Sequence, residues 1–522
     1  MEGHAKTRYE ALEKARQPYL DRGRKCAKLT LPALLPPEGS QDGSQTFTTP
    51  EQSVGARGVN NIAAKLLMAL FPPSAPYLKM EVDAMEAFKL TEQTGSKDEI
   101  DKAFAQYVRR IMTDFESRAL RSDFYEVFRH LVISGNAAFY LPAEGRGRVF
   151  RLDKYVCQRD PSGSLLEWVG KETVAYAALP EDVQKTIPLS HEDTTDSKGA
   201  LPTKPIDKTV DLYTHVILNQ EGTYTVYQEA NGVVVEDTVG EYEPDALPFL
   251  VLRYNKIDGE SFGRGLVEEY LGDLRHLETL SKSMREYVAI ASRIIPLINP
   301  NASLEPKDLT DAQNGEPVVG SRDDVSYLQL ERDHDFQAGR VMMNELQQRL
   351  AFAFLMNTAI QRQGERVTAE EIRYMARELE DTLGGVYSLL ALDLQLPLAK
   401  VQIAQLESTG ALPELPKNIA TPKIVTGMDA LGRGNDLSNL MQFLSIIGQS
   451  PAVESLKWDQ ISLRVANGLN IETDGLIMSE QELQQKHQQE MMKQAMQTMG
   501  GAAVNQMGQL AQQQMETGQS EQ

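Results

Sequence analysis

Gly259, Ser261 and Gly263 form a GxSxG sequence, the pattern that exposes a serine nucleophile on a sharp strand-to-helix turn in one class of hydrolases. The segment lies between an expected strand and an expected helix. Polar residues 255–258 nevertheless separate the serine from the end of the strand, and no HGG-type oxyanion segment precedes it. We therefore interpret the segment as a linker turn and keep a GxSxG serine hydrolase as an alternative.

Other patterns that carry chemistry are missing from the sequence. It contains no GxxxxGK[ST], HExxH or CxxC motif, and its seven histidines include no close pair suited to a metal ion. Two cysteines, Cys26 and Cys157, are too few for a disulfide framework, and a reducing compartment is expected. The sequence thus predicts no catalytic residue, no metal site, no cofactor and no enzymatic activity.

The most distinctive polar feature is a short connector, residues 358–366, with the sequence TAIQRQGER. Arg362 and Arg366 supply positive charge, and Gly364 supplies backbone freedom. Taken alone, Arg366 could pair with Glu370 one turn into the next helix, which would contribute only a few tenths of a kcal/mol. The function of the connector therefore depends on the elements that hold it.

A strong helix start follows the connector. Thr368 and Glu371 have the spacing of a capping box, in which each side chain accepts the backbone N–H of the other residue. Val367 and Ile372 occupy the positions of a hydrophobic staple. Apolar residues then recur every three or four positions, which predicts a helix from 369 to about 395.

Two glycines and a proline mark this helix. The pair at 384 and 385 suggests a kink or a close contact, because glycine costs about 1 kcal/mol in a helix interior. Pro397 is expected to end the helix. Its simplest interpretation is a core helix.

Two further long helices are expected before the connector. Residues 334–357 carry apolar side chains four positions apart, and residues 266–295 have a similar stripe that Pro296 ends. The segment between them, 296–333, is irregular and contains a strand-like VSYLQL. In chain order, a long helix is thus followed by a compact module, and a second long helix then leads to the basic connector.

The remaining chain divides into regions in which the apolar residues recur with either helical or strand-like spacing. Helices are expected at 5–28, interrupted by Pro18, and at 53–71, 97–119 and 122–134. Residues 139–255 form a strand-rich module with an Asn231–Gly232 hairpin turn. Residues 436–486 are helical again, and the Gln/Met-rich tail is either disordered or an amphipathic helix that needs a partner.

Composition limits the classes of function. The chain has 522 residues, 41% of them hydrophobic, so it can bury a large core. Its net charge of −21 argues against a protein that grips nucleic acid, since phosphate binding needs surplus Lys and Arg. It does not argue against a protein that lets nucleic acid pass. No signal peptide or membrane-spanning apolar run is found, so we expect a cytosolic protein as made.

Four blocks of sequence closely resemble the portal, or head-to-tail connector, proteins of short-tailed double-stranded DNA bacteriophages of the podovirus type. They are VGARGVNNIAAKLLMALFPP (54–73), LVISGNAAFYLP (131–142), DGESFGRGLVEEYLGDLRHLE (258–278) and GERVTAEEIRYMARELEDTLGGVYSLLALDLQLPL (364–398). The resemblance covers residues 7–480, and the Gln/Met-rich tail departs from it.

The resemblance implies an α+β, mainly helical portal fold that forms a ring, usually of twelve subunits, around a central DNA channel. The regions that it implies are a wing (1–265, with a strand-rich module at about 139–255), stem helices (266–295 and 334–357), a clip (296–333), a tunnel loop (358–368), a long wing helix with its connector (369–415), a crown (416–486) and a tail (487–522).

The resemblance also implies a place and a set of partners. The ring would occupy one capsid vertex of the virion after assembly in the host cytoplasm. Its implied partners are double-stranded DNA, the terminase large subunit, the tail adaptor protein, and the scaffolding, major capsid and internal core proteins. We hypothesise that Arg362 and Arg366 touch DNA phosphates in the channel. A helical scaffold protein without a channel remains a further alternative.

Overall fold

The computed structural model divides the chain into two units, residues 1–430 and 431–522. It describes residues 4–39, 47–73, 76–82, 97–179, 184, 209–293, 296–301, 304–327, 333–356, 385–413, 420–424, 440–446, 458, 461–462 and 465. In the second unit, residues 440–446 are mainly helical. The labelled helices and strands, α1 (Ala5–Lys28) to β12 (Ala420–Ile424), belong to the first unit.

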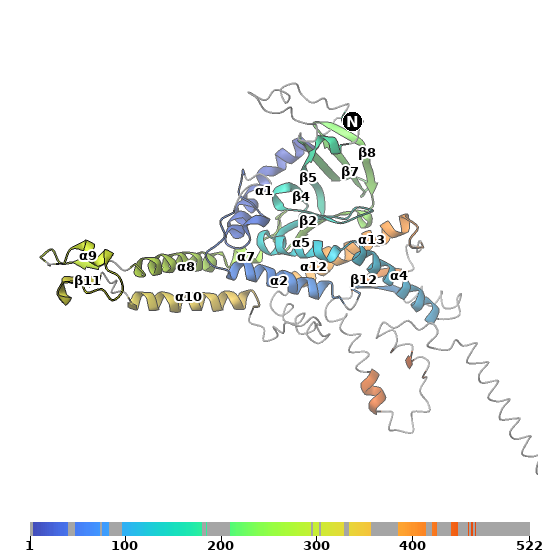
Figure 1. Cartoon of the computed structure of the whole chain (residues 1–522). Coiled ribbons are helices and arrows are strands. Elements are labelled where there is room, and N and C mark those ends of the chain that lie inside the picture. The colour runs from blue at the N-terminus through green and yellow to red at the C-terminus, as the bar shows by residue number, and fades with distance from the viewer. Residues whose placement is uncertain are drawn as a thin grey trace, which may run out of the picture. The chain divides into compact units, whose positions relative to one another are not determined.

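The first unit mixes helices and strands, as the expected α+β class requires (Figure 1). The helices are α1 (Ala5–Lys28), α2 (Val54–Leu70), α4 (Lys97–Ser117), α5 (Leu120–Ser134), α7 (Leu266–Glu269), α8 (Leu271–Ala291), α9 (Pro306–Asp311), α10 (Asp333–Ala353), α12 (Gly385–Leu390) and α13 (Leu396–Ser408). The strands are β1 (Leu78–Val82), β2 (Asn136–Tyr140), β3 (Arg148–Phe150), β4 (Tyr155–Arg159), β5 (Leu165–Ala175), β6 (Thr209–Leu218), β7 (Tyr224–Ala230), β8 (Val233–Tyr242), β9 (Phe249–Arg253), β10 (Pro296–Ile298), β11 (Val325–Tyr327) and β12 (Ala420–Ile424).

Two antiparallel sheets make up the strand-rich module predicted at 139–255. Strands β4, β5, β6, β7 and β8 form a meander in chain order, and β2 lies between β3 and β9 in a second sheet. Asn231 and Gly232 join β7 to β8 with φ angles of 48° and 83°. These left-handed values are typical of a two-residue hairpin turn, so the predicted Asn-Gly turn is confirmed.

Helix α1 is fixed to the five-stranded sheet by buried carboxylates. The Glu229 carboxylate accepts the backbone N–H of Ala5 at 2.5 Å, which satisfies the start of the helix. The Glu167 carboxylate accepts hydrogen bonds from Arg8 Nε at 2.9 Å and pairs with His215 Nε2 at 2.7 Å. Burial raises the pKa of Glu167, but the hydrogen bonds from Arg8 and His215 outweigh it and hold the pKa at about 2.

The predicted interruption of α1 at Pro18 is wrong, because the helix continues through this residue. A proline removes one backbone hydrogen bond. Here the packing of buried residues on both sides, Arg16 and Leu20 among them, compensates for that loss. The Arg16 guanidinium also donates to the carbonyl oxygens of Asp153 and Tyr155 at 3.0 and 3.2 Å.

Aromatic side chains fill the core where α2, α4 and α5 meet. The Phe71 ring stacks on Phe124 with centroids 4.8 Å apart and on Phe115 at 5.2 Å. Each of these side chains is at most 1% exposed. Burying a phenylalanine contributes about 1.5–3 kcal/mol, so this cluster is a main source of stability for the helical part.

The predicted end of the long helix at Pro397 is also wrong. A π-helical turn, Ala391–Gln395, leads directly into α13, and Pro397 lies in the first turn of that helix. Proline is tolerated there because the first N–H groups of a helix have no partner within it. The sheet formed by β1 and β12 was not predicted from the sequence.

None of the helices in the described ranges combines the length and the apolar character of a bilayer span. Cys26 and Cys157 are both buried free thiols. Burial raises the pKa of Cys26 to about 12, which keeps this thiol protonated.

Candidate functional site

Helices α8 and α10 lie side by side and antiparallel (Figure 1). Near one end of the pair, the rings of Tyr287 and Phe336 lie 5.4 Å apart. Near the other end, Arg349 Nη2 donates to Asp273 Oδ1 at 2.9 Å. The predicted helices at 266–295 and 334–357 therefore form a pair that is in contact along its length.

The segment between the two helices closes on itself. Strand β10 pairs antiparallel with β11, so that Pro296 lies opposite Tyr327. Helix α9 begins with a capping box between Glu305 and Asp308. This small tip joins the outgoing helix to the returning one, as the sequence pattern predicted.

Two of the conspicuous sequence blocks meet where the chain approaches α8. Asn136, which is 1% exposed, donates from Nδ2 to Gly263 O at 2.8 Å and accepts the Gly263 N–H at 2.7 Å. Gly135 has a φ of 76°, and a Cβ on it would come 2.2 Å from the carbonyl carbon of Arg264. The blocks at 131–142 and 258–278 are therefore joined by close backbone contact.

The GxSxG segment is part of this contact. Ser261 Oγ accepts the backbone N–H of Arg159 at 3.3 Å, and the Ser261 carbonyl oxygen accepts the Cys157 thiol at 3.7 Å. The backbones of Asn255 and Arg264 pair in both directions at 3.1 and 3.2 Å, which closes the loop between them. The segment is thus a closed turn packed on β4, as the linker interpretation predicted, and the serine does not follow directly on a strand end.

Helix α10 ends against α2. Asn61 Nδ2 donates to the carbonyl oxygens of Phe354 and Leu355 at 2.8 and 3.0 Å, and Lys65 Nζ donates to Leu355 O at 2.9 Å. Leu355 has a φ of 52°, so the chain turns sharply at this point. A cation and an amide from α2 therefore satisfy carbonyl groups at the negative end of the helix.

The predicted connector begins directly after this anchor. The described residues stop at Met356 and resume at Gly385. The candidate channel residues and the predicted cap therefore lie outside the described part of the chain: Arg362, Gly364, Arg366, Val367, Thr368, Glu371 and Ile372.

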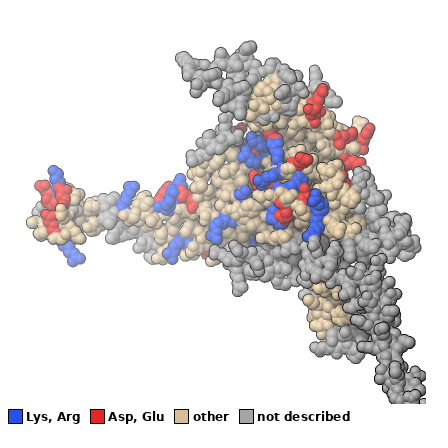
Figure 2. Space-filling model, turned by 45° about the vertical axis from the view of Figure 1, so that its right-hand side comes forward, with Lys and Arg blue, Asp and Glu red and all other residues tan. Residues whose placement is uncertain are grey.

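The helix pair carries an unusual amount of exposed apolar surface. Five large side chains are about half exposed or more: Val288 (50%), Ile290 (55%), Val341 (58%), Met342 (48%) and Phe352 (73%). Large apolar side chains that stay exposed on one pair of helices are candidates for contact with a partner chain. Charged side chains of both signs are distributed over the face seen in Figure 2, including the tip.

Sequence reasoning missed the residues that anchor the pair. Gly58 lies inside the predicted helix 53–71, where a glycine costs about 1 kcal/mol, and that cost was a usable signal of a close helix contact. Asn61 and Lys65 look like ordinary helix-surface residues in the sequence. The partners of Asn136 could not be predicted, because they lie 127 positions away.

These features define a class of protein, in which a mixed α/β body carries an antiparallel helix pair whose exposed apolar side chains suit contact with other chains. The family model for the bacteriophage head to tail connecting protein matches residues 2–477. The portal protein of Escherichia phage T7 is 41% identical over 494 residues, which cover 93% of this chain and 90% of the relative. That of Enterobacteria phage SP6 is 30% identical, with 92% and 90% covered.

A solved structure of the neck of an empty GTA particle also matches, with 13% identity and a TM-score of 0.36 over 79% of this chain and 90% of that chain. A likeness at this level adds nothing to the assignment. The sequence relatives and the family model are sufficient. The chain belongs to the bacteriophage head-to-tail connecting family, the portal proteins, and its function is that of a head-to-tail connector.

Proposed function

We propose that about twelve copies of the chain form a closed ring at one capsid vertex, with a central channel for packaging and ejecting DNA. The observation that supports ring assembly is the set of exposed apolar side chains along α8 and α10. Rotational assembly through unlike surfaces would bury these side chains against the neighbouring subunit. Each buried Å² of apolar surface contributes about 25 cal/mol.

The charge of the chain suits passage of DNA without tight binding. Each phosphate neutralised by Lys or Arg adds affinity and would slow a moving duplex. A chain of net charge −21 supplies few such contacts. Arg362 and Arg366 are the proposed exception: we infer that at least one faces the channel and touches phosphates transiently, which helps to retain packaged DNA.

The tip between α8 and α10 is the proposed docking surface for the terminase large subunit and, after packaging, for the tail adaptor protein. Its exposed apolar residues support this role, with Val319 at 85% and Tyr327 at 57% exposure. Scaffolding, major capsid and internal core proteins would contact the proposed wing and crown. Assembly would begin in the host cytoplasm and end in the virion.

The proposed role is structural and involves no catalysis, metal or cofactor. In a GxSxG hydrolase, Ser261→Ala would abolish activity and serine-directed probes would label the protein. For the proposed head-to-tail connector protein, Ser261→Ala would abolish no activity and serine-directed probes would not label the chain. A scaffold protein without a channel would remain a monomer or dimer.

Light scattering of the purified protein tests the ring. Twelve copies of the 58.1 kDa chain should give a particle of about 700 kDa. Negative-stain images along the axis should show a central opening. A monomer or dimer at assembly concentrations would contradict the proposal.

A further inference from the structure

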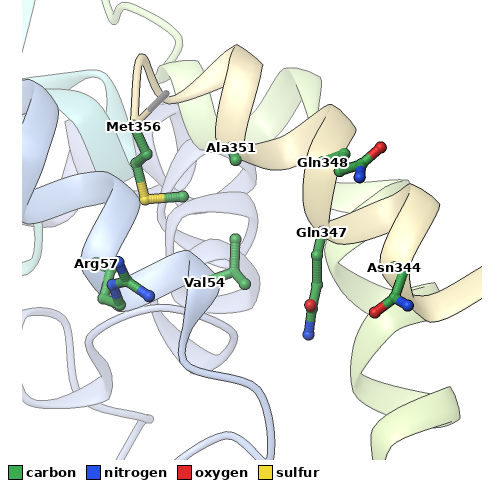
Figure 3. A pocket seen from close by; sticks show the side chains of 7 residues that line it. All are labelled: Val54, Arg57, Asn344, Gln347, Gln348, Ala351 and Met356. Atoms are coloured by element: carbon green, nitrogen blue, oxygen red, sulfur yellow. The ribbon is translucent and has the colours of Figure 1, made fainter. Parts of the chain in front are cut away.

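A groove of about 360 Å³ lies between α2 and α10 (Figure 3). Val54 and Arg57 line it from α2. Asn344, Gln347 and Gln348 line it from α10, one helical turn apart at most. Met356 closes the end at which α10 meets its anchor on α2. The groove therefore has a mixed lining, in which one cation and three carboxamides lie beside Val54, Ala351 and Met356.

The polar groups of the groove are not used within the described part of the chain. There, the side chains of Arg57, Asn344, Gln347 and Gln348 make no hydrogen bond or ion pair. Other arginines close to this junction do pair: Arg349 with Asp273 at 2.9 Å, and Arg285 with Glu51 at 2.7 Å. Arg57 is thus a cation whose partner is not among its described neighbours.

The chemistry of these groups suits an anion with two adjacent oxygens, such as a carboxylate. A guanidinium presents a planar fork of N–H donors that matches two carboxylate oxygens, and the three amides add further donors. Each copy of the chain has 74 Asp and Glu against 53 Lys and Arg, so every copy carries surplus carboxylates.

The surface around the groove resembles the centre of a protein interface. Phe352, 73% exposed, lies one turn from Gln348, and Val341, 58% exposed, lies one turn from Asn344. Aromatic residues and arginine are enriched where two proteins meet, and a charged pair is strongest when apolar neighbours exclude water. The groove and these apolar side chains therefore form one surface that suits contact with a single partner chain.

We propose that this groove receives an aspartate or glutamate side chain of a second copy, so that Arg57 forms an ion pair across the contact between neighbouring subunits. The proposal rests on the ring proposed above. It adds the chemistry of one contact, in which Arg57 and the amides of α10 recognise a carboxylate, and the apolar side chains on either side exclude water from it.

Chemical coupling can identify the partner directly. Arg57→Lys keeps the charge and introduces an amine, which a carbodiimide joins to a carboxylate in direct contact. Rings are assembled from an equal mixture of ¹⁴N- and ¹⁵N-labelled subunits and digested after coupling. We expect peptides in which Lys at position 57 of one label is joined to Asp or Glu of the other label. Coupling confined to one label, for example to acids within 357–384 of the same chain, would overturn the proposal.

Charge reversal tests the contribution of the contact to assembly. Arg57→Glu should raise the protein concentration needed for half-maximal ring formation by about tenfold or more, because it places like charges together. Lys14→Glu is the charge-reversal control, since Lys14 is an exposed cation of α1, outside the groove and outside the apolar side chains proposed to form the ring contact. It should assemble as the wild type does.

The two proposals fail in different ways. If the wild type forms no ring, the proposed function itself is contradicted. If the wild type and Arg57→Glu form rings over the same concentration range, only the groove contact is overturned. The thermal unfolding of both variants, measured below the assembly concentration, should match that of the wild type, which separates a lost contact from a misfolded subunit.

Discussion

Gly58 of α2 lies against the ring of Phe354, so closely that a Cβ on Gly58 would come 2.4 Å from the ring atom Cγ. The contacted atoms belong to the base of the phenylalanine side chain, which cannot turn aside as the end of a long side chain can. The absence of a side chain at position 58 therefore sets how closely α10 approaches α2. This approach in turn places the carbonyl groups of Phe354 and Leu355 within reach of Asn61 and Lys65.

Gly58→Ala should destabilise the subunit despite the better helix propensity of alanine. Overpacking at this contact should cost about 1–3 kcal/mol in the free energy of unfolding, which exceeds the gain of up to about 1 kcal/mol from replacing a helical glycine. Urea denaturation measures the difference. Gly272→Ala is the control, because a Cβ there meets no atom within 4 Å; its stability should be unchanged or slightly higher. Equal stability of the two variants would contradict the packing argument.

Asn136→Ala should weaken the link between the 131–142 and 258–278 blocks. The change removes both hydrogen bonds to Gly263 and leaves a buried N–H and a buried carbonyl oxygen without a partner. Each such group costs about 1–3 kcal/mol. Thermal unfolding should show a lower Tm than that of the wild type.

Asn136→Asp provides the comparison for this prediction. The carboxylate can still accept the Gly263 N–H but cannot donate to the Gly263 carbonyl oxygen. Its Tm should also fall below that of the wild type. A wild-type Tm for both variants would show that the loop is held by other contacts.

The Glu167 carboxylate should make stability depend on pH. Its pKa falls from 4.5 to about 2 on folding, so its contribution is fully present above about pH 4.5 and is lost as the pH falls toward 2. Part of this contribution is screened, since Arg8 is 42% exposed. The difference in unfolding free energy between the wild type and Glu167→Gln should therefore shrink as the pH falls from 4.5 to 3. A difference that does not change over this lower range would exclude the linkage.

Local patterns in the sequence predicted the elements that depend on neighbouring residues. Helical periodicity and the Asn231–Gly232 turn are local, and the predicted helix pair and hairpin are both present. Pro18 and Pro397 misled prediction, because the local preference of proline was overridden by packing in α1 and was harmless in the first turn of α13.

Long-range pairing was not accessible to the same reasoning. Strands β1 and β12 are separated by more than 300 residues, and neither has a strong strand pattern of its own. The anchor of α10 was missed for the same reason, since Asn61 and Phe354 are 293 positions apart. The resemblance to portal proteins placed the helix pair in a functional context that periodicity alone could not supply.

Arg362 and Arg366 of the segment 358–366 are the proposed contacts with DNA. Replacing both with glutamate, Arg362→Glu and Arg366→Glu, should leave the ring intact but reduce the DNA content of filled heads. The physical reason is that the two substitutions turn a phosphate-attracting loop into one that repels phosphate. The measurement is the ratio of full to empty heads after packaging with the variant ring, together with the loss of DNA from full heads over time.

A charge-conserving control makes this result specific. Arg362→Lys and Arg366→Lys keep the cations while removing the planar fork that binds phosphate in two places, so their effect should be smaller. The attraction is electrostatic, and added salt should therefore reduce the difference in DNA retention between wild type and the glutamate variant. Heads that fill and hold DNA normally with glutamate at both positions would show that neither arginine acts on DNA. A pairing of Arg366 with Glu370 would then be the better explanation for its charge.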